Sequence, residues 1–180
     1  MTATHFQSPA FPAIRFPHLA DVELPPLHRV RIRHPEAPAL QNLEKRVADA
    51  LKKCQHLPQI PRGSEVAIAV GSRGISQIDT ITRTVVSQLK DWNLKPFIVP
   101  AMGSHGGGTD EGQQEVLKKL GIDEESMGCE IRSSMKTVDY GSIGEGIHCH
   151  FDANAAGAAG IILVTELKPT RAFLEKLKVG

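Results

Sequence analysis

The chain has 180 residues, enough for one ordinary domain, or for one domain with an appended segment. Its 41% hydrophobic and 23% charged residues are typical of a globular protein, and a net charge of +1 excludes a basic surface for nucleic acid. No apolar run reaches transmembrane length, and the N-terminus lacks a signal-peptide pattern. The three cysteines are an odd, widely spaced set without a Cys-x-x-Cys pair, which fits reduced thiols better than a disulfide framework. We therefore expect a cytoplasmic protein with reduced thiols that binds neither nucleic acid nor membrane.

Prolines are concentrated at the start of the chain. Seven of the twelve lie within residues 1–38 and exclude a long helix there. Residues 27–33 alternate apolar and basic side chains, which predicts a half-exposed edge strand. We therefore divide the chain into a Pro-rich N-terminal segment, residues 1–38, and an α/β domain, residues 39–180. The domain is expected to begin with an amphipathic helix over residues 40–57.

A strand–helix–strand pattern follows. Residues 65–70 form a buried apolar run, and residues 96–101 form a second one. Between them Ile78, Ile81, Val85, Val86 and Leu89 recur at helical spacing. Strand, helix and strand in this order predict a right-handed crossover between two parallel strands. The loops after the two strands are then expected at the same edge of the sheet, which brings Ser72 and Arg73 close to the second loop.

The second loop is rich in glycine. Gly103, Ser104, His105, Gly106, Gly107, Gly108 and Thr109 lie between the second strand and a predicted helix that ends near Gly121. Glycine lets bare backbone N–H groups approach a ligand, and a helix N-terminus favours an anion such as phosphate. His105 is the one side chain of this loop that can exchange a proton near neutral pH. Arg73 could add a bidentate contact to a carboxylate or phosphate. The plainer alternative is an ordinary strand-to-helix turn.

The rest of the chain predicts a hairpin, a helix and a last strand. Residues 137–150 contain the glycines of a hairpin or meander, with His148 and His150 on one face and Cys149 on the other. Two histidines alone make an incomplete metal site, so we interpret that face as solvated. A helix of small residues is expected over 153–160, then a buried strand over 160–164. Lys168 follows this strand. Three roles are open for it: a surface residue, a phosphate contact or a covalent attachment point.

Three stretches resemble the N-terminal half of the nickel-pincer lactate racemase family, in its less characterised branch. They are the sequences Ala-Val-Gly-Ser-Arg-Gly-Ile at residues 69–75, Phe-Ile-Val-Pro-Ala-Met-Gly-Ser-His-Gly-Gly at 97–107, and Ser-Ser-Met at 133–135. The similarity runs from about residue 66 to about residue 173, and the central motif is its most specific part. It implies a Rossmann-like α/β fold, with a mostly parallel sheet flanked by helices.

The resemblance also implies an activity. The family consists of isomerases that racemise or epimerise 2-hydroxy acids. They use a nickel ion held by a pincer mononucleotide, which is tethered to a lysine. By position, Lys168 resembles the tethering lysine, His105 a catalytic acid–base histidine, and Arg73 the arginine near substrate and cofactor. The resemblance places Ser72, Gly103, Ser104, Gly106, Gly107 and Thr109 around the cofactor phosphate or the substrate. A hydroxy acid, a bound anion and a homo-oligomer are the partners expected.

This chain also departs from the family pattern. Thr170 stands where the family has a histidine after the Lys-Pro pair, and no second acid–base histidine is found near residues 133–135. The sequence stops at Gly180, before the family's nickel-binding histidine and second domain. We therefore expect a domain that is incomplete at its C-terminus and does not turn over substrate by itself. The alternatives are a non-catalytic nucleotide- or phosphate-binding module and, less favoured, a serine hydrolase that uses Ser72 or Ser104 with His105.

Overall fold

A computed structural model describes residues 26, 40–72, 74–144 and 146–166. The chain divides into two compact units, Met1–Pro38 and Ala39–Gly180, and nearly all described residues belong to the second. The edge strand predicted over residues 27–33 lies outside the described residues. None of the described helices is long and apolar enough to cross a membrane.

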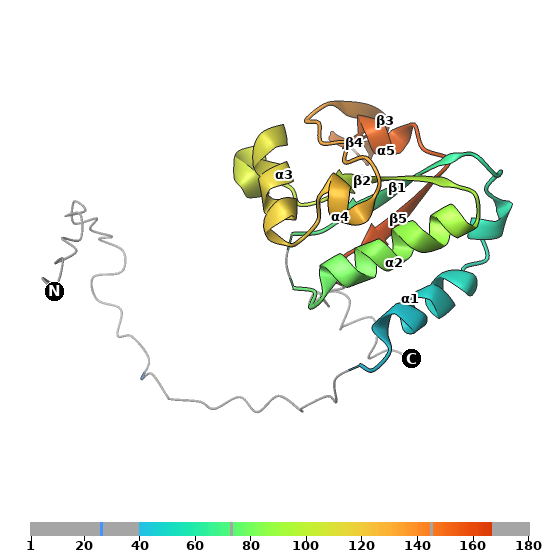
Figure 1. Ribbon diagram of the computed structural model, residues 1–180. Helices are drawn as coiled ribbons and strands as arrows, with labels where there is room; N and C mark the ends of the chain where they lie inside the picture. Colours follow the sequence, from blue (N-terminus) through green and yellow to red (C-terminus); the bar gives the residue numbers. More distant parts are fainter. Residues whose placement is uncertain (1–25, 27–39, 73, 145, 167–180) are drawn as a thin grey trace, which may run out of the picture. The chain divides into compact units, whose positions relative to one another are not determined.

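The second unit is a mixed α/β structure, as predicted (Figure 1). Its described helices are α1 (Leu43–Lys52), α2 (Ile78–Asp91), α3 (Asp110–Lys119), α4 (Glu124–Met127) and α5 (Ala153–Ala156), with the 3₁₀ turns η2 (Leu57–Gln59) and η3 (His105–Gly108). Its strands are β1 (Glu65–Val70), β2 (Lys95–Pro100), β3 (Thr137–Ile143), β4 (Ile147–Asp152) and β5 (Gly160–Val164). The predicted strand–helix–strand unit is confirmed as β1, α2 and β2.

The central sheet is parallel, in the order β2-β1-β5. Strand β1 lies in the middle and is buried along almost its whole length, because both its edges and both its faces are covered. A short parallel bridge between Ile98 and Ile131 extends the sheet beyond β2. The carboxyl ends of β1, β2 and β5 therefore point the same way, which the order of predicted elements required only of β1 and β2.

The two faces of the sheet are packed unequally. On one face, α2 covers the larger core, which includes Val66, Ile68, Val70, Val85, Leu89 and Ile98. Helix α5 lies on the other face (Figure 1). There small residues of β1 and the side chains of Phe97 and Val99 pack against Ala155 of α5. Aliphatic residues dominate both clusters, as expected from a chain with 4% aromatic residues.

Several predicted elements have different bounds. Helix α1 ends at Lys52, not near residue 57 as predicted. Its residues are at best half-buried, so there is little tertiary packing to stabilise a longer helix. The helix predicted over residues 153–160 is only the four-residue α5, because Gly157 follows it and its small residues bury little apolar surface. The hairpin is confirmed as β3 and β4, paired antiparallel with an irregularity between Asp139 and Ser142.

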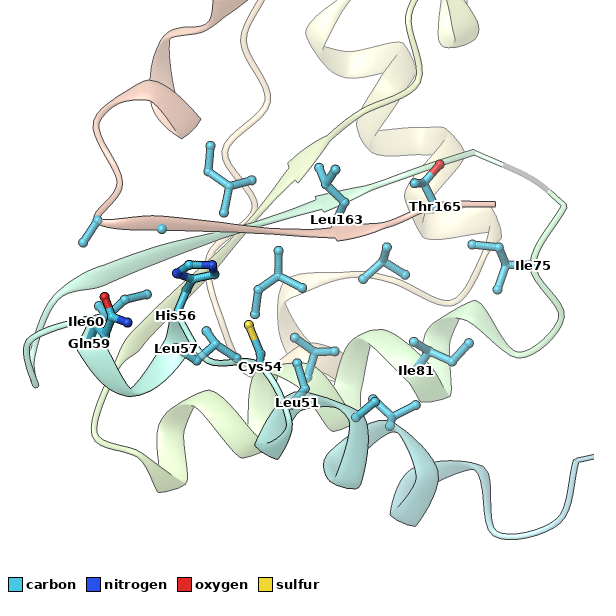
Figure 2. Close-up of a pocket in the computed structure, with 18 of the residues that line it drawn as sticks. Leu51, Cys54, His56, Leu57, Gln59, Ile60, Ile75, Ile81, Leu163 and Thr165 are labelled. Carbon is cyan, nitrogen blue, oxygen red and sulfur yellow. The ribbon is translucent and has the colours of Figure 1, made fainter. Parts of the chain in front are cut away.

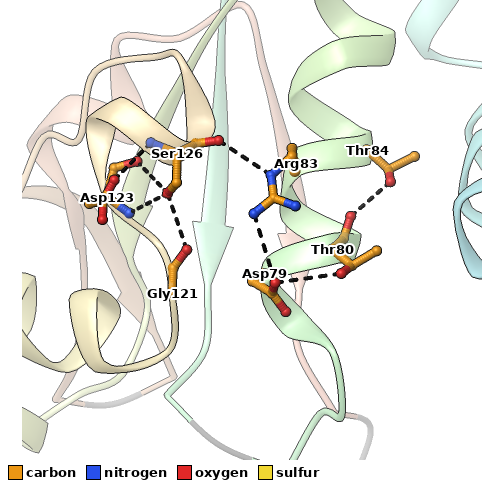
Figure 3. A network of polar contacts seen from close by, with 7 residues as sticks. All are labelled: Asp79, Thr80, Arg83, Thr84, Gly121, Asp123 and Ser126. Atoms are coloured by element: carbon orange, nitrogen blue, oxygen red, sulfur yellow. Dashed lines mark hydrogen bonds and ion pairs between the residues drawn. The ribbon is translucent and has the colours of Figure 1, made fainter.

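A polar network joins α2 to α4 (Figure 3). Arg83 Nε donates to the carbonyl oxygen of Ser126 at 3.3 Å. Asp123 and Ser126 form a reciprocal capping box, in which Ser126 N donates to Asp123 Oδ1 at 2.8 Å and Asp123 N donates to Ser126 Oγ at 3.2 Å. Hydrogen bonds from Ser126 lower the pKa of the Asp123 carboxyl. Helix α4 is thus a separate short element that was not predicted from the sequence.

Candidate functional site

The candidate site is the edge of the sheet where three parallel strands end. The backbone N–H of Ala101 donates to the carbonyl of Val70 at 2.8 Å, which holds the end of β2 beside that of β1. The N–H of Gly71 donates to the carbonyl of Val164 at 3.0 Å, which does the same for β5. We call this edge the rim. Ligands of open α/β sheets bind at such carboxyl ends.

A hydrogen bond between side chains joins the first two loops of the rim. The hydroxyl Oγ of Ser72, after β1, is bonded to Nδ1 of His105, after β2. Both residues are half-buried, so the pair is shielded but still reachable from solvent. Ser72 and His105 were both predicted as site residues, and the structure brings them together. Ser104, the other serine considered beside His105, is exposed.

The glycines of the second loop have two different roles. Gly103, Gly106, Gly107 and Gly108 all have φ between 59° and 73°, a region that L side chains rarely adopt. A Cβ on Gly106 would lie 2.4 Å from the carbonyl carbon of Gly112, so that glycine is needed for packing against α3. A Cβ on Gly103, Gly107 or Gly108 would meet nothing within 4 Å. The backbone at these three positions therefore borders open space.

Helix α3 fixes the far side of this loop. Thr109 is its N-cap, with Oγ1 accepting from Gly112 N at 3.1 Å and donating to the carbonyl of Gly106 at 3.2 Å. Gln113, one turn further, is buried, and its Nε2 donates to the carbonyl of Gly103 at 2.8 Å. Oδ1 of Asp110, also at the helix start, is buried without a hydrogen-bond partner among the described residues. Gln113 was not predicted as a site residue. The signal in the sequence was its polar side chain on the same helix face as the apolar Leu117.

The third motif of the resemblance also reaches this helix. Ser133 Oγ donates to the backbone carbonyl of Asp110 at 3.1 Å. The two residues are 23 positions apart, and nothing in their spacing indicated the contact. The structure thus places residue 133 at the start of α3, next to the glycine-rich loop.

The β5 side of the rim is described up to Glu166. A Cβ on Gly74 would lie 2.1 Å from Oε2 of Glu166, so the first loop and the residues after β5 are in close contact. Gly71 likewise faces Thr165, whose Oγ1 would be 3.7 Å from a Cβ there. Arg73 and Lys168, the predicted substrate and tethering residues, lie outside the described residues.

A large cavity of the described residues lies apart from Ser72 and His105. A groove of about 860 Å³ runs between α1, η2 and β5, with Leu51, Ile60, Ile81 and Leu163 in its walls (Figure 2). Its lining is mostly aliphatic, and neither Ser72 nor His105 borders it. Because binding sites for polar substrates need converging polar groups, we keep the rim as the candidate site.

The two histidines of β4 lie on one face of the hairpin, as predicted. The rings of His148 and His150 stack with centroids 6.5 Å apart, and Nδ1 of His148 lies 3.2 Å from Oδ2 of Asp139. The N–H of Gly141, then His148, lower the pKa of the Asp139 carboxyl. His148 and His150 are exposed. Within the described part of the chain, no three His, Cys, Asp or Glu residues are grouped to hold a metal ion.

Comparisons with protein-family models, with curated proteins and with solved structures find no match to this chain. The geometry of the rim therefore carries the functional argument.

Proposed function

We propose that this chain is the cofactor-binding half of a racemase or epimerase of 2-hydroxy acids, with its acid–base group at the rim. One observation carries the proposal: the hydrogen bond that holds the His105 ring against Ser72, across the ends of two neighbouring parallel strands. The resemblance to nickel-pincer lactate racemases assigns the same histidine to proton transfer. The Rossmann-like fold, the cytoplasmic location and the carboxylate-binding role of Arg73 belong to this proposal.

The rim fits the phosphate of a pincer nucleotide. The open space beside Gly103, Gly107 and Gly108 leaves room for a group that approaches the bare backbone, and the N-terminus of α3 favours negative charge. We expect this loop to hold the phosphate and Lys168 to form the covalent tether. When bound, the nickel nucleotide would supply the acceptor and donor of hydride.

The residues of the chain itself would move the proton. A serine hydroxyl can donate or accept a hydrogen bond, so Ser72 is able to hold either neutral tautomer of His105. If the hydroxyl accepts from Nδ1–H, Nε2 is unprotonated and can take the hydroxyl proton of the substrate. The imidazolium that results still donates its Nδ1–H to Ser72 and can return the proton from Nε2. The same hydrogen bond therefore suits proton transfer in both directions, which racemisation requires.

The experiment is expression of the full chain together with the enzymes that make the cofactor, followed by peptide mass spectrometry and nickel analysis. We expect a mass increment on the peptide that contains Lys168, and bound nickel, with both lost in Lys168→Ala. His105→Ala should retain the increment, because His105 is assigned to proton transfer. Absence of the increment and of nickel from the wild-type chain would contradict the proposal.

A phosphate-binding module without catalysis is the second candidate. It is favoured by the open glycine backbone, which needs no lysine tether to bind an anion. It predicts that inorganic phosphate and AMP bind in calorimetry to wild type and Lys168→Ala equally, without any cofactor adduct. Gly107→Asp, which places a carboxylate beside the open space, should abolish that binding.

A serine hydrolase is less favoured, although Ser72 is hydrogen-bonded to His105. Nucleophile–base pairs depend on a third group that orients the base. Within the described residues, no further side chain forms a hydrogen bond with the His105 ring. Covalent labelling of Ser72 by a fluorophosphonate would support this function over the other two.

A further inference from the structure

The hairpin of β3 and β4 has one apolar and one polar face. Cross-strand pairing places Val138 opposite Phe151 and Ile143 opposite Ile147, with Cys149 between them along β4. Tyr140 joins this face, because its ring meets that of Phe151 edge-on, with centroids 5.5 Å apart. We call these residues the apolar hairpin face. The opposite face carries Thr137, Asp139, Ser142, His148, His150 and Asp152.

The apolar hairpin face is largely uncovered in the described part of the chain. Ile143 is 68% exposed, Tyr140 66% and Ile147 63%, while Val138 and Phe151 retain 37% and 39%. A two-stranded hairpin is marginally stable by itself in water, and gains stability when a hydrophobic face is packed. The alternation of apolar and polar residues therefore indicates a surface that is covered in the working protein.

We propose that a second copy of this chain covers the apolar hairpin face, through a two-fold symmetric contact between the two hairpins. This inference is independent of the proposed function of the rim. A two-fold contact joins one patch to the same patch, so the patch must tolerate its own charges. None of the described side chains on the apolar hairpin face carries a charge at neutral pH, whereas Asp139 and Asp152, the carboxylates of the two paired strands, lie on the polar face. The net charge of +1 adds little repulsion between copies.

The area of the face is at the lower limit of what a dimer needs. A large aromatic side chain can bury about 150–250 Å². With somewhat smaller values for the aliphatic residues, the exposed fractions correspond to roughly 500 Å² of apolar surface per copy. Two copies would then bury about 1,000 Å², which is the lower bound for a specific interface. Pairing of the faces would leave the two polar faces in water, so the carboxylates and imidazoles of the paired strands would not need to be desolvated.

The test is sedimentation velocity of the full chain over a concentration series, on wild type, Ile143→Glu, Ile147→Glu and Leu163→Glu. Leu163 is the matched control, because it is 69% exposed but lies on β5 of the other sheet. We expect wild type to be dimeric at tens of micromolar. Each hairpin variant should weaken dimerisation more than tenfold, since it would bury a carboxylate at the interface. Leu163→Glu should change it less than twofold.

Circular dichroism of the same four proteins tests whether unfolding is the cause of any loss of dimerisation. It should show the same helix content for all four proteins, and a similar melting temperature at a concentration where wild type is monomeric, because the substituted side chains are exposed in the monomer. A wild type that stays monomeric at every concentration would overturn the proposal, and another part of the chain or another protein would then cover the face. Dimerisation that is lost in Leu163→Glu but kept in both hairpin variants would also overturn it.

Discussion

Ser72 Oγ and His105 Nδ1 are hydrogen-bonded across the ends of two neighbouring parallel strands, although the residues lie 33 positions apart. The bond connects the short loop after β1 to the glycine-rich loop after β2. It therefore restricts the His105 ring and ties together the two segments on which the proposed site depends. The bond uses Nδ1, so Nε2 is the ring nitrogen that it leaves for a ligand.

Removal of the Ser72 hydroxyl should release the ring. We expect Ser72→Ala to lower the free energy of unfolding by about 1 kcal/mol, the usual contribution of one hydrogen bond, and to change the ¹⁵N shifts of the His105 ring. Ser104→Ala is the control, because Ser104 is exposed and precedes His105 in the chain. It should change neither the free energy of unfolding nor the ¹⁵N shifts of the His105 ring. Nitrogen shifts of His105 that are identical in wild type and Ser72→Ala would show that the bond is not formed in solution.

Two adjacent glycines should respond differently to the same substitution. Gly107→Ala adds a methyl group to open space and should cost only the strain of positive φ, about 1–2 kcal/mol of unfolding free energy. Gly106→Ala adds that strain and also a contact of 2.4 Å with the backbone of α3, so the loss should be clearly larger. Urea denaturation measures both. Equal losses would mean that the loop and α3 are not packed as described.

Gln113 should be a structural support of the loop. Gln113→Leu leaves the carbonyl of Gly103 without its 2.8 Å partner, so we expect a loss of about 1–3 kcal/mol in unfolding free energy. Amide hydrogen exchange of residues 103–109 should accelerate more than exchange in β1. Gln114→Leu, on the exposed side of the same helix, is the control and should affect neither measurement.

The regular elements of the fold were predictable because their patterns are strong. The apolar run of β1 and the helical spacing of Ile78, Val85 and Leu89 each have one favourable interpretation, and the structure confirms both. The shared edge of β1 and β2 then followed from the topology of a parallel crossover. This is why the sequence could bring the loops of Ser72 and His105 together.

Short elements and side-chain contacts were not predictable in the same way. Helix α4 depends on one capping box between Asp123 and Ser126, and α5 on four small residues, so neither has a long periodic pattern. Contacts such as Ser133 with the start of α3 depend on the path of intervening loops, which no local pattern fixes. The partner of His105 was likewise open, because the sequence offered both Ser72 and Ser104.

Arg132 should make the stability of the fold depend on pH. Its guanidinium donates to both carboxylate oxygens of Glu65, at 2.7 and 3.2 Å, and lies 4.0 Å from the centre of the Phe97 ring. The hydrogen bonds from Arg132 lower the pKa of Glu65 from 4.5. A carboxyl with a lower pKa in the folded state stabilises the fold above pH 4.5, and this contribution is lost as the pH falls through the lowered value.

Glu65→Gln should therefore lower the urea midpoint at pH 7, and the difference from wild type should shrink as the pH falls below 4.5. Glu115→Gln is the matched control, because Glu115 pairs with Lys119 at 3.0 Å on an exposed helix surface, where ion pairs contribute little. Glu115→Gln should change the urea midpoint only slightly, both at pH 7 and below pH 4.5. A Glu65→Gln difference that stays constant down to acidic pH would show that the loss comes from packing of the side chain and not from its charge.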